Sequence, residues 1–331
     1  MSDSRPQQFP IARQPAGLPP PRRPGSIRRT TTLDSHWPDG QGAAWLMTGR
    51  GRDLLTPAQG APQVVDEAEF LLQCSPRREI LALETVPPLD RASDMIGTRA
   101  GGASRARLVE VLPDARGTLL YQLLDDFAGA SLVAPWAWSK WTPDWADQGK
   151  GVGPSNEDMD NICTGFATGA SSHGDDGRIN TAIQSSTPVD NLPDPADPLS
   201  WHRLVQPDGP AHRRARRLDL WREGSLLKAD VYFQDSAVLP TGSRIAVHEY
   251  RVFADLDAAS GALIAIKAIP HILPYAECPG ATLHIGRLVG KPVADFRDVV
   301  LTELVGTLGC THLNDVARSL ADIPTLARSL A

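Results

Sequence analysis

The stretch that decides the fold reads LDLWREGSLLKADVYF and runs from Leu218 to Phe233. Two segments rich in apolar and β-favouring residues flank Glu223-Gly224, a two-residue link typical of a β-hairpin. A second pair of such segments, 245–256 and 263–269, is joined by the turn-forming residues 257–261. Two consecutive hairpins predict a four-stranded antiparallel meander.

The same signals recur nearer the N-terminus. Segments 28–34 and 44–54 flank a Trp-Pro-Asp-Gly turn, and segments 69–74 and 79–84 flank a Ser-Pro-Arg-Arg turn. Helical spacing of apolar residues appears at 105–112, at 119–126 and twice near the C-terminus, at 299–308 and 313–320. We therefore expect an α+β fold, a mainly antiparallel β-sheet built from hairpins with a C-terminal helix pair packed on it.

The chain divides into an arm and one domain. Residues 1–26 contain seven prolines and four arginines among few large apolar residues. They cannot form a packed unit alone, so we expect a flexible arm or an arm that lies on a neighbouring subunit. Residues 27–331 are expected to form a single domain, with a long irregular insertion at about 147–210 that serves as a lid or packs over the core.

Composition excludes several classes of protein. The formal net charge of -6 argues against nucleic acid or an anionic membrane as the main partner. Four cysteines without a CxxC pair, and no secretory leader, indicate a reduced, cytoplasmic protein. No apolar run approaches the roughly 20 residues that a membrane span needs.

Candidate chemistry is densest in the segment Gly309–Asp315. We expect Gly309 to end one helix in the left-handed conformation and Thr311 to cap the next. Cys310 would then lie at a helix N-terminus, which favours a thiolate, and His312 and Asp315 would form an i, i+3 pair. This arrangement suits acid–base catalysis by His312 oriented by Asp315, but it suits a structural helix corner equally well.

The proline-stiffened connection 270–279 carries further polar residues. If the C-terminal helices fold back over the meander, this connection meets the helix corner, and Tyr275 or an arginine could stabilise an oxyanion there. The candidate catalytic residues are His312, Asp315, Tyr275, Glu277 and Cys310.

A metal site is the alternative for the same region. Cys278, Cys310, His312 and His271 would supply four ligands, but structural zinc sites usually contain a close pair such as CxxC. We therefore expect no metal, no cofactor and no stoichiometric zinc or iron.

Substrate contacts are expected from arginines and tryptophans. Pairing of the first two strands would gather Arg28, Arg29, Arg50, Arg52 and Asp53, either as a structural lattice or as a site for a carboxylate, enolate or phosphate. Four tryptophans within residues 136–145 suggest a pocket wall or a subunit contact. The candidate substrate-binding residues are Arg29, Arg50, Trp136, Trp138, His248 and His271.

Several of these motifs together resemble a known family. Residues 28–32 (RRTTT), 37–40 (WPDG), 50–53 (RGRD), 123–126 (LLDD), 273–279 and 309–313 are similar to the bacterial family called domain of unknown function 2889. The resemblance covers most of the chain from Ile27 onward, and the proline-rich arm has no counterpart in it. It implies a bacterial cytoplasmic protein and supplies no catalytic residues.

The sequence therefore favours a cofactor-independent enzyme of the lyase or isomerase type. It would act by acid–base chemistry on an apolar or aromatic small molecule in bacterial catabolism, since motifs for nucleotides, serine hydrolysis and nucleic acids are missing. The site is expected between the meander and the C-terminal corner, walled by the tryptophan-rich segment. The alternative is a non-catalytic ligand-binding or assembly subunit, in a homo-oligomer whose interface contains the same aromatics.

Overall fold

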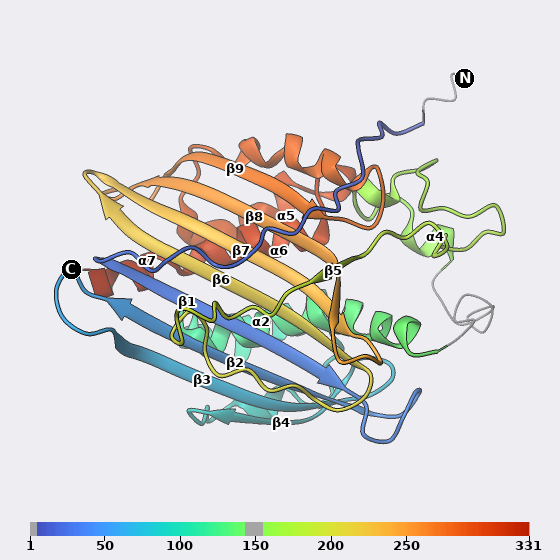
Figure 1. Ribbon diagram of the computed structural model, residues 1–331, viewed down its shortest axis with the longest axis horizontal. Helices are drawn as coiled ribbons and strands as arrows, with labels where there is room; N and C mark the ends of the chain where they lie inside the picture. Colours follow the sequence, from blue (N-terminus) through green and yellow to red (C-terminus); the bar gives the residue numbers. More distant parts are fainter. Residues whose placement is uncertain (1–4, 143–154, 331) are drawn as a thin grey trace.

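The computed structural model describes residues 5–142 and 155–330. These residues form one nine-stranded sheet in which the paired strands are antiparallel, in the order β4-β3-β2-β1-β6-β7-β8-β5, with β9 also paired to β8 (Figure 1). The strands are β1 (Ser26–His36), β2 (Trp45–Thr56), β3 (Gln63–Cys74), β4 (Ile80–Val86), β5 (Thr187–Val189), β6 (Ala211–Glu223), β7 (Leu226–Val238), β8 (Arg244–Asp257) and β9 (Leu263–Ile272).

The predicted hairpins are confirmed. Strands β1 to β4 form one antiparallel set, and strands β6 to β9 form the meander. The two sets become one sheet because β1 pairs with β6, with Arg29 opposite Leu218. Strand β6 also begins earlier than the apolar pattern suggested, since it includes the arginine-rich residues 211–217.

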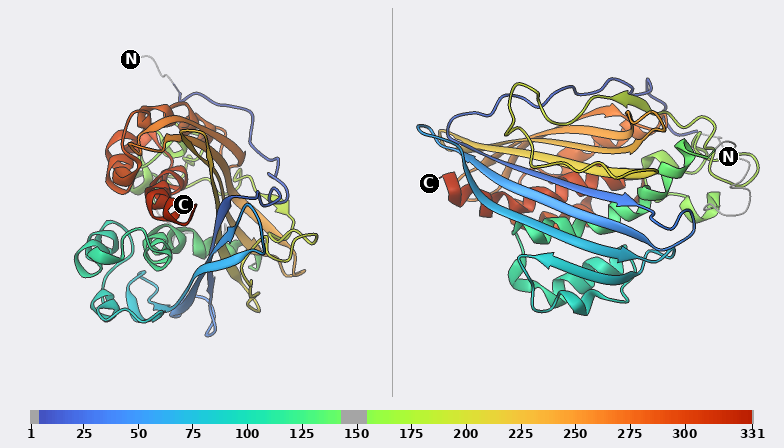
Figure 2. Two further views of the ribbon diagram at one scale, coloured as in Figure 1. Left: turned by 90° about the vertical axis from the view of Figure 1, so that its left-hand side faces the viewer. Right: turned by 60° about the horizontal axis from the view of Figure 1, so that its bottom comes forward.

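Helices cover one face of this sheet, as Figure 2 shows. They are α1 (Gly102–Val111), α2 (Leu119–Val133), α5 (Phe296–Glu303), α6 (Thr311–Ser319) and α7 (Ile323–Ala327), with the short α4 (Asn156–Met159) beyond the end of the sheet. The α+β class and the C-terminal helices packed on the sheet are thus confirmed. No helix among the described residues is both long enough and apolar enough to cross a bilayer.

Two apolar clusters fill the space between the sheet and the helices. One joins the meander to the C-terminal helices and includes Phe233, Tyr250 and Phe296. The other joins the β1–β4 half to α1 and α2 and includes Phe70 and Phe127. Each half of the sheet therefore has its own helical cover.

The C-terminal corner differs in detail from its prediction. Helix α5 ends at Glu303, a short 3-10 turn (Gly306–Leu308) follows, and Cys310 takes the N-cap position expected for Thr311. Gly309 has φ -128°, so it is extended and not left-handed. A glycine is needed there because a Cβ would collide with the Leu304 carbonyl and the Asn314 side chain.

The arm and the later part of the insertion lie on the other face (Figures 1 and 2), whereas Thr164, in the earlier part, donates through its N–H and its hydroxyl to the Gly309 carbonyl at the C-terminal corner. The described part of the arm packs along its own sheet: the Leu273 N–H donates to the Ala12 carbonyl at 3.1 Å, and the Phe9 N–H to the Ala276 carbonyl at 2.9 Å. The arm that we expected to be flexible, or to lie on a neighbour, is thus placed by backbone hydrogen bonds that its proline-rich composition does not reveal. From the insertion, β5 pairs with β8.

A buried ion pair connects the sheet to the helical layer. Arg214 of β6 binds Asp235 of β7 through Nε and Nη2 at 2.9 and 2.8 Å, and binds Asp315 of α6 through Nη1 at 2.9 Å. Helix α2 crosses directly over this group at Gly129, where a Cβ would collide with both Arg214 Nη1 and Asp315 Oδ2. A glycine in the middle of a helix is unfavourable in itself, so close packing explains its presence.

We expect Gly129→Ala to destabilise the protein by about 2 kcal/mol or more, because the added methyl group must force Arg214 and Asp315 apart or push α2 away from the sheet. Helix propensity alone predicts a gain of up to about 1 kcal/mol. Urea unfolding measures the difference.

The matched control is Gly102→Ala at the start of α1, where nothing lies within 4 Å of the new Cβ. That variant should be as stable as the parent or more stable. Equal stability of the Gly129→Ala variant and the parent would show that α2 does not depend on this close approach.

Candidate functional site

His312 lies against a second predicted residue, His248. Their rings stack with centroids 3.5 Å apart and planes 16° apart, and His312 is only 8% exposed. The carboxylate that faces His312 is Asp235, whose Oδ2 lies 3.4 Å from His312 Nε2. Asp315 instead binds Arg105 and Arg214, so the expected orientation of His312 by Asp315 is not what the structure contains.

Burial has the largest effect on the pKa values of the two stacked histidines. It lowers the pKa of His312 to about 4, although Asp235 acts in the opposite direction. The pKa of His248 is held well below its usual value by burial and by the neighbouring His312. For Asp235, burial alone would raise the pKa, but Arg214 and His212 hold it well below the usual range. Near neutral pH the imidazoles are therefore uncharged and the carboxylate is ionised.

Cys310 is a buried thiol. Its Sγ lies 3.8 Å from His312 Nδ1, so the two predicted residues are adjacent. Burial raises the pKa of Cys310, which outweighs the hydrogen bonds from backbone N–H groups at the start of α6. The prediction of a thiolate at Cys310 is thus wrong. Cys310 does lie at a helix N-terminus, but desolvation has the larger effect on its pKa.

Tyr275 and Glu277 contact the insertion. The Tyr275 hydroxyl donates to the Asn180 carbonyl at 3.3 Å, and its ring packs edge-on against Phe166. Glu277 accepts hydrogen bonds from the N–H and the hydroxyl of Ser171 at 3.0 and 2.8 Å. Burial alone would raise the pKa of Glu277, but these bonds and one from Gln8 hold it below its usual value. Both residues fasten the insertion and the arm to the connection 270–279.

The expected arginine cluster is divided by the sheet. Successive side chains of a strand point to opposite faces, so Arg29 and Asp53 lie under the helices, where they form a salt bridge of 2.7 Å. Arg50 points to the arm side and pairs with Glu69 at 2.9 Å. Pairing of β1 with β2 is as predicted, but it does not produce one arginine site.

The remaining candidate substrate-binding residues make their contacts elsewhere and do not join the two stacked histidines. His271 Nδ1 donates to the Gln14 carbonyl in the arm at 3.1 Å. Trp136 donates from its indole N–H to Gln184 at 2.8 Å, and Trp138 packs edge-on against Trp37. Trp145 lies outside the described residues.

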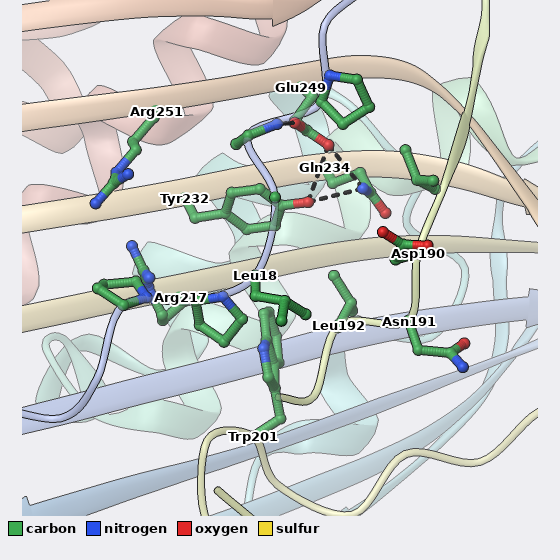
Figure 3. Close-up of a pocket in the computed structure, with 16 residues that line it drawn as sticks. Leu18, Asp190, Asn191, Leu192, Trp201, Arg217, Tyr232, Gln234, Glu249 and Arg251 are labelled. Atoms are coloured by element: carbon green, nitrogen blue, oxygen red, sulfur yellow. Dashed lines mark hydrogen bonds between the residues drawn. The ribbon is translucent and has the colours of Figure 1, made fainter. Parts of the chain in front are cut away.

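A different set of residues forms a pocket on the arm side of the meander (Figure 3). The floor comes from alternate residues of three neighbouring strands, and the walls come from Trp201, from insertion residues 189–192 and from arm residues 15–20. The floor residues are Arg217 on β6, Tyr232 and Gln234 on β7, and Glu249 and Arg251 on β8.

Glu249 is the centre of this floor. Its Oε2 accepts from the Tyr232 hydroxyl at 3.0 Å and from the Gln234 amide at 2.8 Å, and its Oε1 accepts from the Ala16 N–H of the arm (Figure 3). Glu249 is 1% exposed. Burial and the adjacent carboxylate raise the pKa of Tyr232 well above its usual value, so the phenol remains protonated and can only donate or accept hydrogen bonds.

Two guanidinium groups flank the cluster. Arg251 binds Asp230 through Nε and Nη2 at 2.9 and 2.6 Å, and Arg217 binds the same carboxylate through Nη2 at 2.8 Å. The Nη1 of each arginine has no hydrogen bond within the described parts of the chain. The site thus combines a carboxyl group, a phenol and guanidinium nitrogens that have no hydrogen bond among the described residues.

The arm nearly fills the pocket. A cavity of about 40 Å³ remains beneath it, which is room for a water molecule or two and not for an aromatic ring. A ligand of the expected size therefore requires residues 15–20 to move away from Glu249.

The sequence contained a partial signal for this pocket. The alternation in β8 placed Glu249 and Arg251 on one face, and Asp230, Tyr232 and Gln234 show the same period of two in β7. Trp201 carried no signal, because its position on the sheet depends on the path of the insertion.

The family comparison agrees with the resemblance seen in the sequence. Residues 212–325 match the model of the family described as protein of unknown function (DUF2889). The matched segment contains the meander and the C-terminal helices, so it is shorter than the resemblance suggested and excludes the motifs at 28–126. Searches of curated proteins and of solved structures found no match.

His202 fixes the insertion to the sheet beside this pocket. Its two ring nitrogens lie 2.9 Å from Thr30 Oγ1 and 3.0 Å from Thr32 Oγ1. Burial, together with Arg213 and Arg52, lowers its pKa to about 3, so it is neutral in the folded protein. In the unfolded chain a histidine has a pKa near 6.5.

We expect the free energy of unfolding to fall as the pH is lowered from about 6.5 towards 3, because the unfolded state binds a proton that folded His202 cannot accept. His202 contributes a slope of up to about 1.4 kcal/mol per pH unit. Replacement by Gln should make the decrease shallower by about that amount, as measured by urea unfolding at pH 7, 6 and 5.

A His202→Phe variant separates the titration from the loss of hydrogen bonds. Both variants lack the titrating group, so both should have the shallower slope whatever their stability at pH 7. A slope equal to that of the parent would contradict the assignment of His202 as a buried neutral histidine.

Proposed function

We propose that the pocket beneath the arm is the functional site of a lyase or isomerase that acts on an apolar or aromatic small molecule by acid–base chemistry. The observation that carries this proposal is the contact between Tyr232 and Glu249, a phenol and a carboxylate 3.0 Å apart on the floor of a pocket walled by Trp201. Pairs of this kind supply a proton acceptor and a hydrogen-bond donor at one place.

The role of each group follows from its hydrogen bonds. Glu249 Oε1 accepts from the backbone N–H of Ala16, so a substrate O–H or acidic C–H that displaces the arm takes the place of this donor. The carboxylate receives the substrate proton, and the electron pair stays on the substrate. Tyr232 turns its O–H towards the resulting negative charge, and the amide of Gln234 donates beside it.

The fate of that electron pair defines the reaction type. If it expels a leaving group, the reaction is that of a lyase. If Glu249 returns the proton to another atom, the reaction is an isomerisation. Either sequence balances without an external oxidant or reductant, and the apolar side chains of Leu18, Leu192 and Trp201 would enclose the rest of the substrate.

Ligand binding without turnover is the second candidate. One observation favours it: Glu249 already accepts three hydrogen bonds, which hold the carboxylate in place as a hydrogen-bond acceptor. In this case the same pocket would hold a hydroxyl-bearing ligand and no bond would change.

We expect 4-hydroxybenzyl alcohol, which has an aromatic ring and O–H donors, to bind the full-length protein as measured by isothermal titration calorimetry. Glu249→Gln should weaken binding about 10-fold or more, since a hydrogen bond to a charged acceptor contributes about 1.5–3 kcal/mol. The matched control is Glu69→Gln on the same face of the sheet, whose partner is Arg50, and it should bind like the parent.

Turnover separates the two functions. If mass spectrometry of hydroxyl-bearing aromatic compounds incubated with the protein finds a product, Glu249→Gln should slow its formation by about 100-fold or more. Binding that depends on Glu249 without any product supports the binding subunit. Equal binding to the parent and to Glu249→Gln would contradict the proposal that this pocket is the functional site.

A further inference from the structure

A second constellation lies on the opposite face of the same strands. Asp235, His248 and His312 each offer one metal-ligating atom, and these atoms all lie within 4.8 Å of one another. The residues come from β7, β8 and α6, so they meet only in the folded chain. We propose that they bind one divalent transition-metal ion of the zinc type, a site separate from the pocket and beyond the function proposed for it.

The spacing of His312 and Asp235 supports a metal better than a hydrogen bond. His312 Nε2 and Asp235 Oδ2 are 3.4 Å apart and form no hydrogen bond. An N–H···O bond is typically about 2.7–3.2 Å long. Two donors bound to one tetrahedral zinc ion at about 2.0–2.1 Å are separated by about 3.4 Å. The two atoms are therefore at the separation of neighbouring ligands.

His248 supplies an independent indication. Its Nδ1 is buried and has no hydrogen-bond partner among the described residues. An unsatisfied buried nitrogen is costly, and an ion is one of the recognised explanations for such an atom. Its ring is stacked on that of His312 with planes 16° apart, so the lone pairs of the two rings run nearly parallel, and the rings must tilt apart before one nitrogen of each points at the same ion.

Asp235 is held in a fixed orientation for this role. Arg214 binds its two oxygens from one side, as an outer partner that positions a ligating carboxylate. Each carboxylate oxygen has two lone pairs, so Oδ2 keeps one for an ion on the side of His312. His212 occupies the corresponding position at the other oxygen, with Nε2 3.3 Å from Oδ1.

The charges around the site are balanced before an ion enters. Arg214 is itself paired with Asp315 as well as Asp235, and Asp315 is paired with Arg105. The two arginines and two aspartates cancel, and the histidines can bind a metal only in their neutral form. Two imidazoles and one carboxylate leave a coordination position open, which is typical of a catalytic zinc site and not of a structural one.

The test uses the full-length protein, stripped of metal by dialysis against a chelator and then titrated with Zn²⁺ by calorimetry and with Co²⁺ by visible absorption. We expect one ion per chain, a visible Co²⁺ spectrum of low symmetry and a higher melting temperature with Zn²⁺. His248→Gln and His312→Gln should each weaken Zn²⁺ binding about 10-fold or more and remove most of the Co²⁺ spectrum. His284→Gln, at the junction between the 3-10 segments Cys278–Leu283 and Ile285–Leu288, is the control and should bind like the parent.

Three results would overturn the proposal. The first is a parent protein that binds no stoichiometric Zn²⁺ or Co²⁺. The second is unchanged binding in both histidine variants. The third is a rise in melting temperature with Zn²⁺ that is as large in His248→Gln and in His312→Gln as in the parent, since the ion would then bind at another place. Circular dichroism of each variant confirms that a lost ion is not caused by a lost fold.

Discussion

The fold depends on two buried salt bridges that Arg214 makes, one with Asp235 and one with Asp315. All three side chains are buried, and removing such charges from water costs several kcal/mol per ion, so each must meet its partners with good geometry. The guanidinium lies on a central strand, one carboxylate on the next strand and the other on α6. The position of the C-terminal helix over the sheet is therefore set by a directional contact, and α2 can close over it only at Gly129.

These two salt bridges belong to a larger lattice of buried ion pairs under the helices. Arginines and aspartates alternate through it, so each aspartate in a helix faces at least one arginine from another element. The remaining pairs are Arg29 with Asp53 and Asp322, Arg297 with Asp125 and Asp322, Arg318 with Asp125, Arg105 with Asp125 and Asp315, and Arg216 with Asp126. Apolar packing tolerates small shifts between a helix and a sheet. These ion pairs do not tolerate them, because a misplaced helix would leave charges buried and unpaired. The lattice thus specifies one register of helices on the sheet.

The sequence predicts those parts of the fold whose signal is local. Hairpins follow from alternation and turns, as at Glu223-Gly224, and the helix pair follows from apolar spacing. Pairing of β1 with β6 has no local signal, because its partners are about 190 residues apart. The run Arg213–Arg217 was not recognised as a strand, because charged residues are rarely buried unless paired, and the partners are distant in sequence. Of the predicted site residues, His312, His248 and Cys310 lie together in the structure. Asp235, Tyr232 and Trp201 were not predicted, because the residues that they contact are distant in sequence.

A β-bulge lies directly beside the residues through which β7 and β8 carry polar chemistry on both faces. Asp235 pairs with His248, but Ser236 pairs with Ala246, so Val247 is an extra residue in β8. The extra residue reverses the alternation beyond it. His248 is therefore the last residue of this polar row that points to the helices, and Arg244 points to the arm side, where it donates to Ser236 and to Gln206 of the insertion. Without the bulge Arg244 would point to the helical face and would lose its contacts with Ser236 and Gln206. The bulge thus directs Arg244 away from the helical face, and bulges occur frequently next to functional sites.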